Sequence, residues 1–250
     1  MKVSRDTWLM ILLLVILVAI MTVAGSGEQA ALPPLVSTSA APDGAKALQL
    51  WMPELGHQVD ENLVSEFKPP QGVETIFMLQ PDLILDSEWE PLDVWVEAGG
   101  TLLAFNDASE YAIETLKLPV KNALAGVRNT EFYAPGSVFA GDVDKSHPVG
   151  KSFNAPTPGV WFENGPAFDI TDPSQAVAVA KYPATGNSLL SGWLLGPAKL
   201  NGKAALVDVT RGKGHVVLFG FRPQYRGQTE STLPLIWGAI LRPNENAVRP

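Results

Sequence analysis

Cysteine is absent from this chain of 250 residues, and its absence excludes disulfide bonds, thiol nucleophiles and cysteine-based metal sites together. Positive charge is also scarce. The chain has 18 Lys and Arg against 26 Asp and Glu, which gives a formal net charge of -8 at pH 7. Nucleic acids and anionic lipid surfaces are bound through clusters of Lys and Arg. Since no such cluster follows the N-terminus, we expect no nucleic-acid partner.

The N-terminus carries the longest apolar run of the chain. Lys2 and Arg5 precede an apolar stretch from Trp8 to Ala24, which Thr22 alone interrupts. At about 1.5 Å per helical residue this stretch, together with Thr7, just spans a hydrocarbon core of about 30 Å. The basic flank predicts a cytoplasmic N-terminus and an exported remainder. We predict that residues 1–24 are an uncleaved membrane anchor, and a signal peptide that is cleaved after export remains the alternative.

Composition divides the rest of the chain. Residues 25–42 are rich in Gly, Ser, Ala, Thr and Pro, which predicts a linker. A folded domain is predicted at residues 43–242, followed by a tail at residues 243–250. The apolar content of 46% with 18% charged residues is ordinary for a globular protein and allows a sizeable core.

Strand and helix signals alternate in the first half of the domain. Residues 74–80 and 101–105 are short apolar runs typical of buried strands. Between them a helix is predicted to begin after Ser87 and to stop at Gly99 and Gly100. A strand, a helix and a second strand in this order form a βαβ unit. We therefore predict an α/β domain with a mostly parallel sheet flanked by helices.

The second half of the domain ends in a predicted β-hairpin. Two apolar runs at residues 204–210 and 215–221 are separated by the short turn sequence at residues 211–214. A polar loop follows, and then a helix is predicted at residues 229–241. Residues 121–185 are rich in Gly and Pro, and we expect them to form an inserted layer over one edge of the sheet.

The candidate ligand-binding residues share one feature, which is that each follows a buried strand. They are Arg222, Gln224, Tyr225 and Arg226 after the hairpin, and Asn106 and Asp107 after the strand at 101–105. Arginine binds carboxylates through paired hydrogen bonds, and aromatic rings stack on sugars. We expect a carboxylate or glycan ligand. The alternative is that Arg222 only ties neighbouring loops together.

Seven short phrases along the domain carry a family resemblance. They are EAGGTLL at 97–103, NDASEYAI at 106–113, LPVKN at 118–122, EFYAPG at 131–136, SHPV at 146–149, LLSGWLLG at 189–196 and GKGHVVLFGFRPQYRGQ at 212–228. Together they resemble the accessory C-terminal domain of large bacterial zinc carboxypeptidase-like proteins. That domain has the class I glutamine amidotransferase-like, flavodoxin-like α/β fold.

The resemblance implies the fold of an amidotransferase without its chemistry. Such enzymes place a Cys after a central strand and a His and a Glu after a late strand. Here Arg222 stands where the general base would be, and Gln224 stands where the orienting carboxylate would be. Arginine cannot accept a proton near neutral pH, and a neutral amide cannot replace a carboxylate.

Peptidase chemistry is not indicated either. A carboxypeptidase zinc site needs a Glu three residues after a His. The residues at that spacing from His57, His147 and His215 are Asp60, Gly150 and Leu218. We expect no metal ion and no cofactor.

A hydrolase with a non-standard nucleophile is the alternative function. Ser109 or Asp107 could serve as that nucleophile, and Ser109 could form a triad with His147 and Asp144. No Gly-x-Ser-x-Gly phrase surrounds Ser109, and a serine after a strand is more often a helix cap. We expect an exported, membrane-anchored, non-catalytic binding or assembly module of the cell envelope. Its partner would be a cell-wall ligand or an envelope protein such as a separate peptidase.

Overall fold

The computed structural model describes residues 46–59, 72–78, 89–155, 158–225 and 230–242. The predicted anchor at residues 1–24, the linker at 25–42, the tail at 243–250 and Arg226 lie outside the described residues. Every described residue belongs to one compact unit of the chain. Within these described ranges, no helix is both long and apolar enough to cross a membrane.

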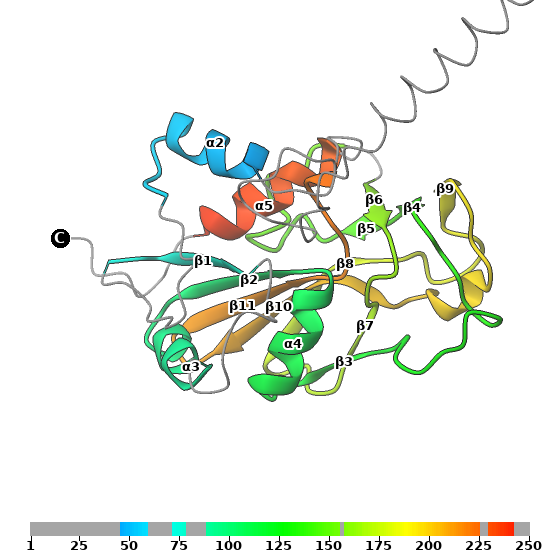
Figure 1. Cartoon of the computed structure of the whole chain (residues 1–250), viewed down its shortest axis with the longest axis horizontal. Helices are drawn as coiled ribbons and strands as arrows, with labels where there is room; N and C mark the ends of the chain where they lie inside the picture. The colour runs from blue at the N-terminus through cyan, green and yellow to red at the C-terminus, as the bar shows by residue number, and fades with distance from the viewer. Residues whose placement is uncertain (1–45, 60–71, 79–88, 156–157, 226–229, 243–250) are drawn as a thin grey trace, which may run out of the picture. The chain divides into compact units, whose positions relative to one another are not determined.

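Eight strands of the described chain form one mixed sheet (Figure 1). Its main order is β1–β2–β11–β10–β7–β3, and β8 pairs with both β10 and β5. The bounds are β1 (Thr75–Met78), β2 (Thr101–Phe105), β3 (Val120–Asn122), β5 (Asp142–Val143), β7 (Phe168–Ile170), β8 (Ala176–Lys181), β10 (Ala204–Arg211) and β11 (Gly214–Phe219). The strands β1, β2 and β11 run parallel, whereas β10 runs antiparallel to β11.

The predicted α/β class and C-terminal hairpin are present, but the prediction of a mostly parallel sheet is wrong. The strands β10 and β11 are joined by only Gly212 and Lys213. Gly212 has φ 59°, a left-handed conformation that suits glycine. A two-residue connection can join only antiparallel strands, so the strand direction reverses at β10. The further pairings of β10 with β7 and β8, and of β7 with β3, are all antiparallel.

Helices cover both faces of this sheet (Figure 1). The helices α3 (Trp89–Glu97) and α4 (Asp107–Thr115) lie on one face, and α2 (Lys46–Glu54) and α5 (Leu233–Ile240) lie on the other. The helix predicted between Ser87 and Gly99 corresponds to α3. The helix predicted at 229–241 corresponds to α5 with the 3-10 turn η5 (Glu230–Thr232) before it.

The insertion predicted at residues 121–185 is not a separate layer. Its strands β5, β7 and β8 belong to the main sheet. Only β4 (Ser137–Ala140) and β6 (Gly159–Phe162) leave it, and with β9 (Leu189–Ser191) they form a three-stranded sheet in the order β6–β4–β9. Short strands of this kind take their partners from tertiary packing rather than from local propensity, so sequence patterning could not assign them.

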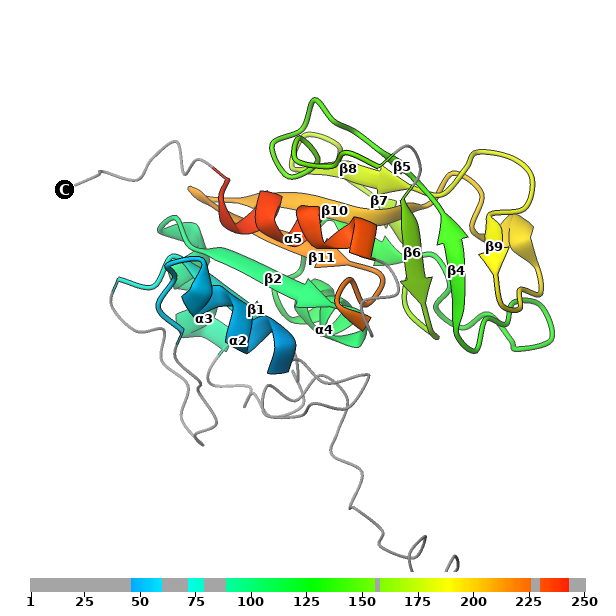
Figure 2. The ribbon, with the colours of Figure 1, turned by 90° about the horizontal axis from the view of Figure 1, so that it is seen from above.

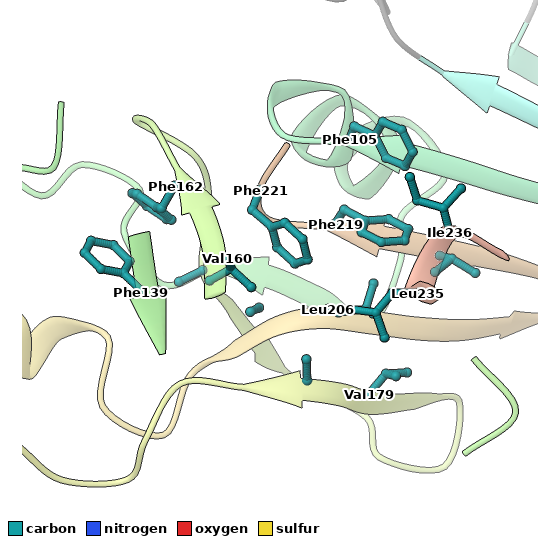
Figure 3. Packing of buried hydrophobic residues seen from close by; sticks show 14 of the residues in the cluster. Phe105, Phe139, Val160, Phe162, Val179, Leu206, Phe219, Phe221, Leu235 and Ile236 are labelled. Carbon is teal, nitrogen blue, oxygen red and sulfur yellow. The ribbon is translucent and has the colours of Figure 1, made fainter. Parts of the chain in front are cut away.

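The two sheets share one hydrophobic core on the α5 face. Phe105 and Phe219 meet edge to face, with their ring centres 4.9 Å apart (Figure 3). The same cluster continues through Phe221 to Phe139 and Phe162 of the small sheet (Figure 3). Figure 2 shows the small sheet beside the end of the main sheet where β2 and β11 finish. The polar residues that follow β2, β6 and β11 are therefore brought to one place.

Candidate functional site

A single strained residue connects β2 to α4. Asn106 has φ 52° and ψ -119°, which is a sparsely populated conformation for any residue but glycine. Its N–H donates a hydrogen bond of 2.7 Å to the carbonyl of Phe219, the last residue of the neighbouring strand. A Cβ added to Gly165 would lie 2.3 Å from the Asn106 amide oxygen, so the glycine makes room for this side chain. Strained backbone persists only where the surroundings hold it, and it concentrates at functional sites.

Arg222 is buried next to this turn and forms a partly buried ion pair. The residue is 9% exposed, and its Nη1 donates a hydrogen bond of 3.1 Å to Oε2 of Glu163. Its backbone N–H donates to the carbonyl of Trp161 at 3.3 Å, which joins the segment after β11 to β6. Sequence reasoning missed Glu163, because nothing in the pattern after β6 indicates that its partner lies 59 residues away.

Asp107 adds a second carboxyl group to the site. The amide Nδ2 of Asn106 donates to Oδ1 of Asp107 at 2.9 Å. Although Asp107 reaches solvent, the surrounding protein desolvates it enough to raise its pKa above the usual range. The positive charge of Arg222 opposes this rise in pKa, and the negative charge of Glu163 adds to it. The charged groups of Asp107, Arg222 and Glu163 therefore lie within electrostatic reach of one another.

Unpaired polar atoms concentrate around these residues. We use the name carboxyl-end cluster for Asn106, Asp107, Trp161, Glu163, Arg222 and Gln224, which lie after or at the end of β2, β6 and β11. In the part of the chain that the structure describes, seven buried side-chain N and O atoms have no hydrogen-bond partner. Five of the seven belong to this cluster: Asn106 Oδ1, Trp161 Nε1, Arg222 Nε, Gln224 Nε2 and Gln224 Oε1.

Such atoms are costly, and their concentration needs a physical explanation. An unpaired buried donor or acceptor costs about 1–3 kcal/mol, and native proteins contain few of them. Five of them belong to three segments that backbone hydrogen bonds join near the carboxyl ends of β2 and β11. An external partner is the simplest explanation, because ligands of α/β proteins bind at that edge.

The aromatic residues of the region are already engaged. The ring of Tyr225 stacks on Trp161, with centroids 4.3 Å apart and planes 6° from parallel. Of the neighbouring aromatic residues, Phe162 of β6 is fully buried and Trp193 is exposed beside β9. Stacking therefore fixes the direction of the Trp161 N–H, and it uses one face of the Tyr225 ring that we expected to stack on a sugar.

The structure does not assemble the serine triad considered in the sequence. Ser109 is fully buried, and its hydroxyl lies 2.9 Å from the carbonyl oxygen of Ala104 and 3.0 Å from that of Phe219. Ser109 therefore packs α4 onto the sheet instead of facing a substrate. Asp144 accepts hydrogen bonds from the N–H and hydroxyl of Ser146, which places it in a local turn.

Two of the three histidines meet a different carboxylate. His147 Nε2 lies 3.3 Å from Oδ2 of Asp208, and His215 Nδ1 lies 3.1 Å from Oδ1 of the same residue. Asp208 is 3% exposed and also contacts Arg242. Across the described ranges, no group of three or more His, Asp or Glu side chains is arranged to hold a metal ion.

Comparison with known proteins places this chain in a family. Residues 37–223 match a family that is described as a domain of unknown function, DUF4350. The chain belongs to the DUF4350 family. This match corrects the resemblance drawn from the sequence to the amidotransferase-like accessory domain of carboxypeptidase-like proteins. The phrases behind that resemblance are short pieces of turn, strand and helix, which many α/β domains share. No curated protein matches the chain.

Solved structures resemble the DUF4350 domain only distantly. A ThuA-like protein from Bacteroides uniformis has 14% identity and a TM-score of 0.46, over 78% of this chain and 82% of that one. A protein assigned to GMP synthase from Thermoplasma acidophilum has 11% identity and a TM-score of 0.41, over 68% and 72%. A cytoplasmic protein from Salmonella typhimurium has 14% identity and a TM-score of 0.42, over 67% and 70%.

Proposed function

We propose that this DUF4350 chain is an exported, non-catalytic binding module that captures a small polar ligand of the cell envelope at the carboxyl-end cluster. In this proposal the apolar run at residues 1–24 holds the domain at the membrane. The observation that carries the binding function is the concentration of five unpaired buried polar atoms around Arg222. A ligand that pairs these atoms recovers the free energy that they cost in the unliganded protein.

Two further features support a binding role for this cluster. It lies at the carboxyl ends of the parallel strands β2 and β11, where open α/β sheets bind their ligands. The strained conformation of Asn106 holds a polar side chain at that edge, although a relaxed turn would be more stable.

The side chains of the cluster favour binding over catalysis. An amide, an indole and a guanidinium are neither nucleophiles nor general bases near neutral pH. The carboxyl groups of Asp107 and Glu163 are the exceptions. Glu163 is paired with Arg222, whereas the raised pKa of Asp107 makes a hydrolase with Asp107 as general acid the second candidate. Under that candidate, Asp107→Asn would abolish turnover of a bound ligand while its affinity stayed within about twofold.

Thermal unfolding of the full-length chain in detergent tests the binding function. The compounds would be neutral sugars, cell-wall peptides and dicarboxylates, and each would be measured with wild type and Arg222→Lys. A ligand at 100 times its dissociation constant adds about 2.7 kcal/mol to the free energy of unfolding. We expect one class to stabilise the wild type and not Arg222→Lys, because lysine cannot reproduce the guanidinium geometry.

Arg128→Lys is the matched control, since the side chain of Arg128 is 76% exposed and pairs with the nearby Glu131. It should respond to the ligand as the wild type does. If no compound stabilises the wild type, or if Arg222→Lys responds equally, the binding function is wrong.

Export is tested separately with a reporter at the C-terminus. Alkaline phosphatase is active only outside the cytoplasm, so its fusion to the full chain should be active and membrane-bound. The same fusion without residues 1–24 should be inactive. Equal activity of the two fusions would contradict the role of the N-terminal run.

A further inference from the structure

We infer that the ligand of the carboxyl-end cluster is an uncharged polyhydroxyl compound, of the chemical class of neutral saccharides. This inference rests on the proposed binding function and selects between the carboxylate and glycan ligands that the sequence left open. Three observations carry it: the charge of the cluster, the chemistry of its unpaired atoms and their distribution over the chain.

The charge of the cluster disfavours an anion. The positive charge of Arg222 is already paired with Glu163, whose Oε2 lies 3.1 Å from Nη1. Asp107 supplies a second acidic group within electrostatic reach of both residues. An incoming carboxylate would compete with Glu163 for one guanidinium and would lie close to two acidic side chains. The site therefore differs from an arginine fork that is open to a carboxylate.

The unpaired atoms require a ligand that both donates and accepts hydrogen bonds. Trp161 Nε1 and Arg222 Nε are donors, Asn106 Oδ1 is an acceptor, and the Gln224 amide offers one group of each kind. A carboxylate only accepts and an ammonium group only donates, so either would leave buried groups unpaired. A hydroxyl group does both and carries no charge.

Because the unpaired atoms are spread over the chain, a ligand needs several hydroxyl groups to pair with them. They come from three segments of the chain: the turn after β2, strand β6 and the segment after β11. A single amide could reach only some of them, whereas a ring of hydroxyls presents a donor and an acceptor in several directions. The stacked Tyr225 holds the Trp161 N–H in one direction, so the indole acts here as a donor and not as a stacking surface.

Titration calorimetry with matched probes tests this inference on the full-length chain in detergent. The probes are glucose, galactose, mannose and N-acetylglucosamine, with glucuronate and glucosamine as charged counterparts, and succinate and glutaramide as a dicarboxylate and an amide. We expect a neutral sugar to bind at least tenfold more tightly than its charged counterparts and the two non-sugar probes.

Two variants remove hydrogen-bonding groups from the cluster and leave an apolar side chain in their place. Trp161→Phe deletes the indole N–H, and Gln224→Met deletes both amide groups. Each should weaken binding of the neutral sugar about tenfold, which corresponds to about 1.4 kcal/mol. The controls are Trp193→Phe at an exposed tryptophan and Gln175→Met at an exposed glutamine, and both should bind as the wild type does.

Stability measurements separate lost binding from lost folding. Replacing an unpaired buried amide by an apolar group of similar shape removes a desolvation cost. Without ligand, Gln224→Met should therefore unfold at the same midpoint as the wild type or at a higher one. A fall in the midpoint would mean that the amide is paired in the folded protein, which contradicts the argument from unpaired atoms.

A charge change provides an independent test. Glu163→Gln leaves Arg222 without its anionic partner, so glucuronate should gain at least tenfold in affinity while the neutral sugar changes less. If the wild type prefers glucuronate or succinate, and Trp161→Phe and Gln224→Met weaken that binding, the ligand class is wrong but the binding function stands. If no probe binds, the ligand class is overturned. The broader panel that contains wall peptides then decides the binding function by itself.

Discussion

His147 Nε2 lies 3.3 Å from Asp208 Oδ2, and the two side chains are 12% and 3% exposed. Asp208 lies near the middle of β10 on the face covered by α5, and it also contacts His215 and Arg242. We call these four residues the Asp208 cluster. It joins the loop after β5, two adjacent strands and the segment that follows α5. Its integrity should therefore control the stability of the domain.

The protonation state of His147 predicts sensitivity to acid. Nδ1 of His147 accepts a hydrogen bond from the Val149 N–H at 3.3 Å, so the neutral ring carries its proton on Nε2. Burial lowers the pKa of His147 below 6.5, and the charges of Arg242 and His215 lower it further while Asp144 opposes them. Because the unfolded state then binds more protons, stability is retained above pH 6.5 and lost as pH falls toward the lowered pKa.

Urea unfolding of the full chain between about pH 8 and about pH 5 measures this loss. The histidine contributes a slope of at most about 1.4 kcal/mol per pH unit, and His147→Gln should remove that contribution. Thr115→Ala, which replaces a residue without an ionisable side chain at an exposed site in α4, is the control and should keep the slope of the wild type. If His147→Gln has the slope of the wild type, the assignment of a buried neutral imidazole is wrong.

Asp208→Asn should destabilise the domain strongly. The substitution removes the carboxylate that contacts Arg242, whose side chain is 17% exposed, and breaking a buried ion pair costs about 3–5 kcal/mol. Glu131→Gln removes the partner of Arg128 in a solvent-exposed pair and should cost no more than about 1 kcal/mol. The free energy of unfolding in denaturant compares the two variants, and similar losses would contradict a special role for Asp208.

Gly238→Ala should destabilise the protein although alanine is the better helix former. In a helix interior alanine is favoured over glycine by about 1 kcal/mol. A Cβ at Gly238 would lie 2.1 Å from the carbonyl oxygen of Val149, so α5 would have to move away from the loop that contains Val149. We expect a net loss of about 1–3 kcal/mol in thermal or urea unfolding. Thr115→Ala, exposed in α4, is the control for helix propensity and should be neutral or stabilising.

Ser109→Ala should cost stability and leave chemical reactivity unchanged. The single proton of the buried hydroxyl is shared between main-chain carbonyls of β2 and β11, and losing this hydrogen bond costs about 1 kcal/mol. A fluorophosphonate probe should label neither the wild type nor the variant. Labelling of the wild type that disappears in Ser109→Ala would restore the hydrolase hypothesis for this serine.

Local patterns predicted the elements better than their arrangement. The apolar runs at β1, β2, β10 and β11 and the glycines after α3 indicated these strands and this helix, because such signals depend on residues a few positions apart. The same patterns could not show that β8 pairs with β10, or that the hairpin makes most of the sheet antiparallel. Strand pairing depends on contacts between residues that are distant in the sequence.

The candidate site was likewise predicted only in part. Asn106, Asp107 and Arg222 were expected together because they follow buried strands, and the pairing of Phe105 with Phe219 does bring those strand ends side by side. The partner of Arg222, the strain at Asn106 and the unpaired state of Gln224 were not visible in the sequence. Neither was the convergence of two histidines and an arginine on the buried carboxylate of β10.

The sequence by itself determined the kinds of element, the hairpin and the segments that carry polar groups, because these follow from periodicity, turn residues and composition. Only the tertiary structure decided which polar groups are paired, which are buried and which share one space. Burial and pairing depend on the surroundings of each atom, and the packing of segments up to about a hundred residues apart supplies those surroundings.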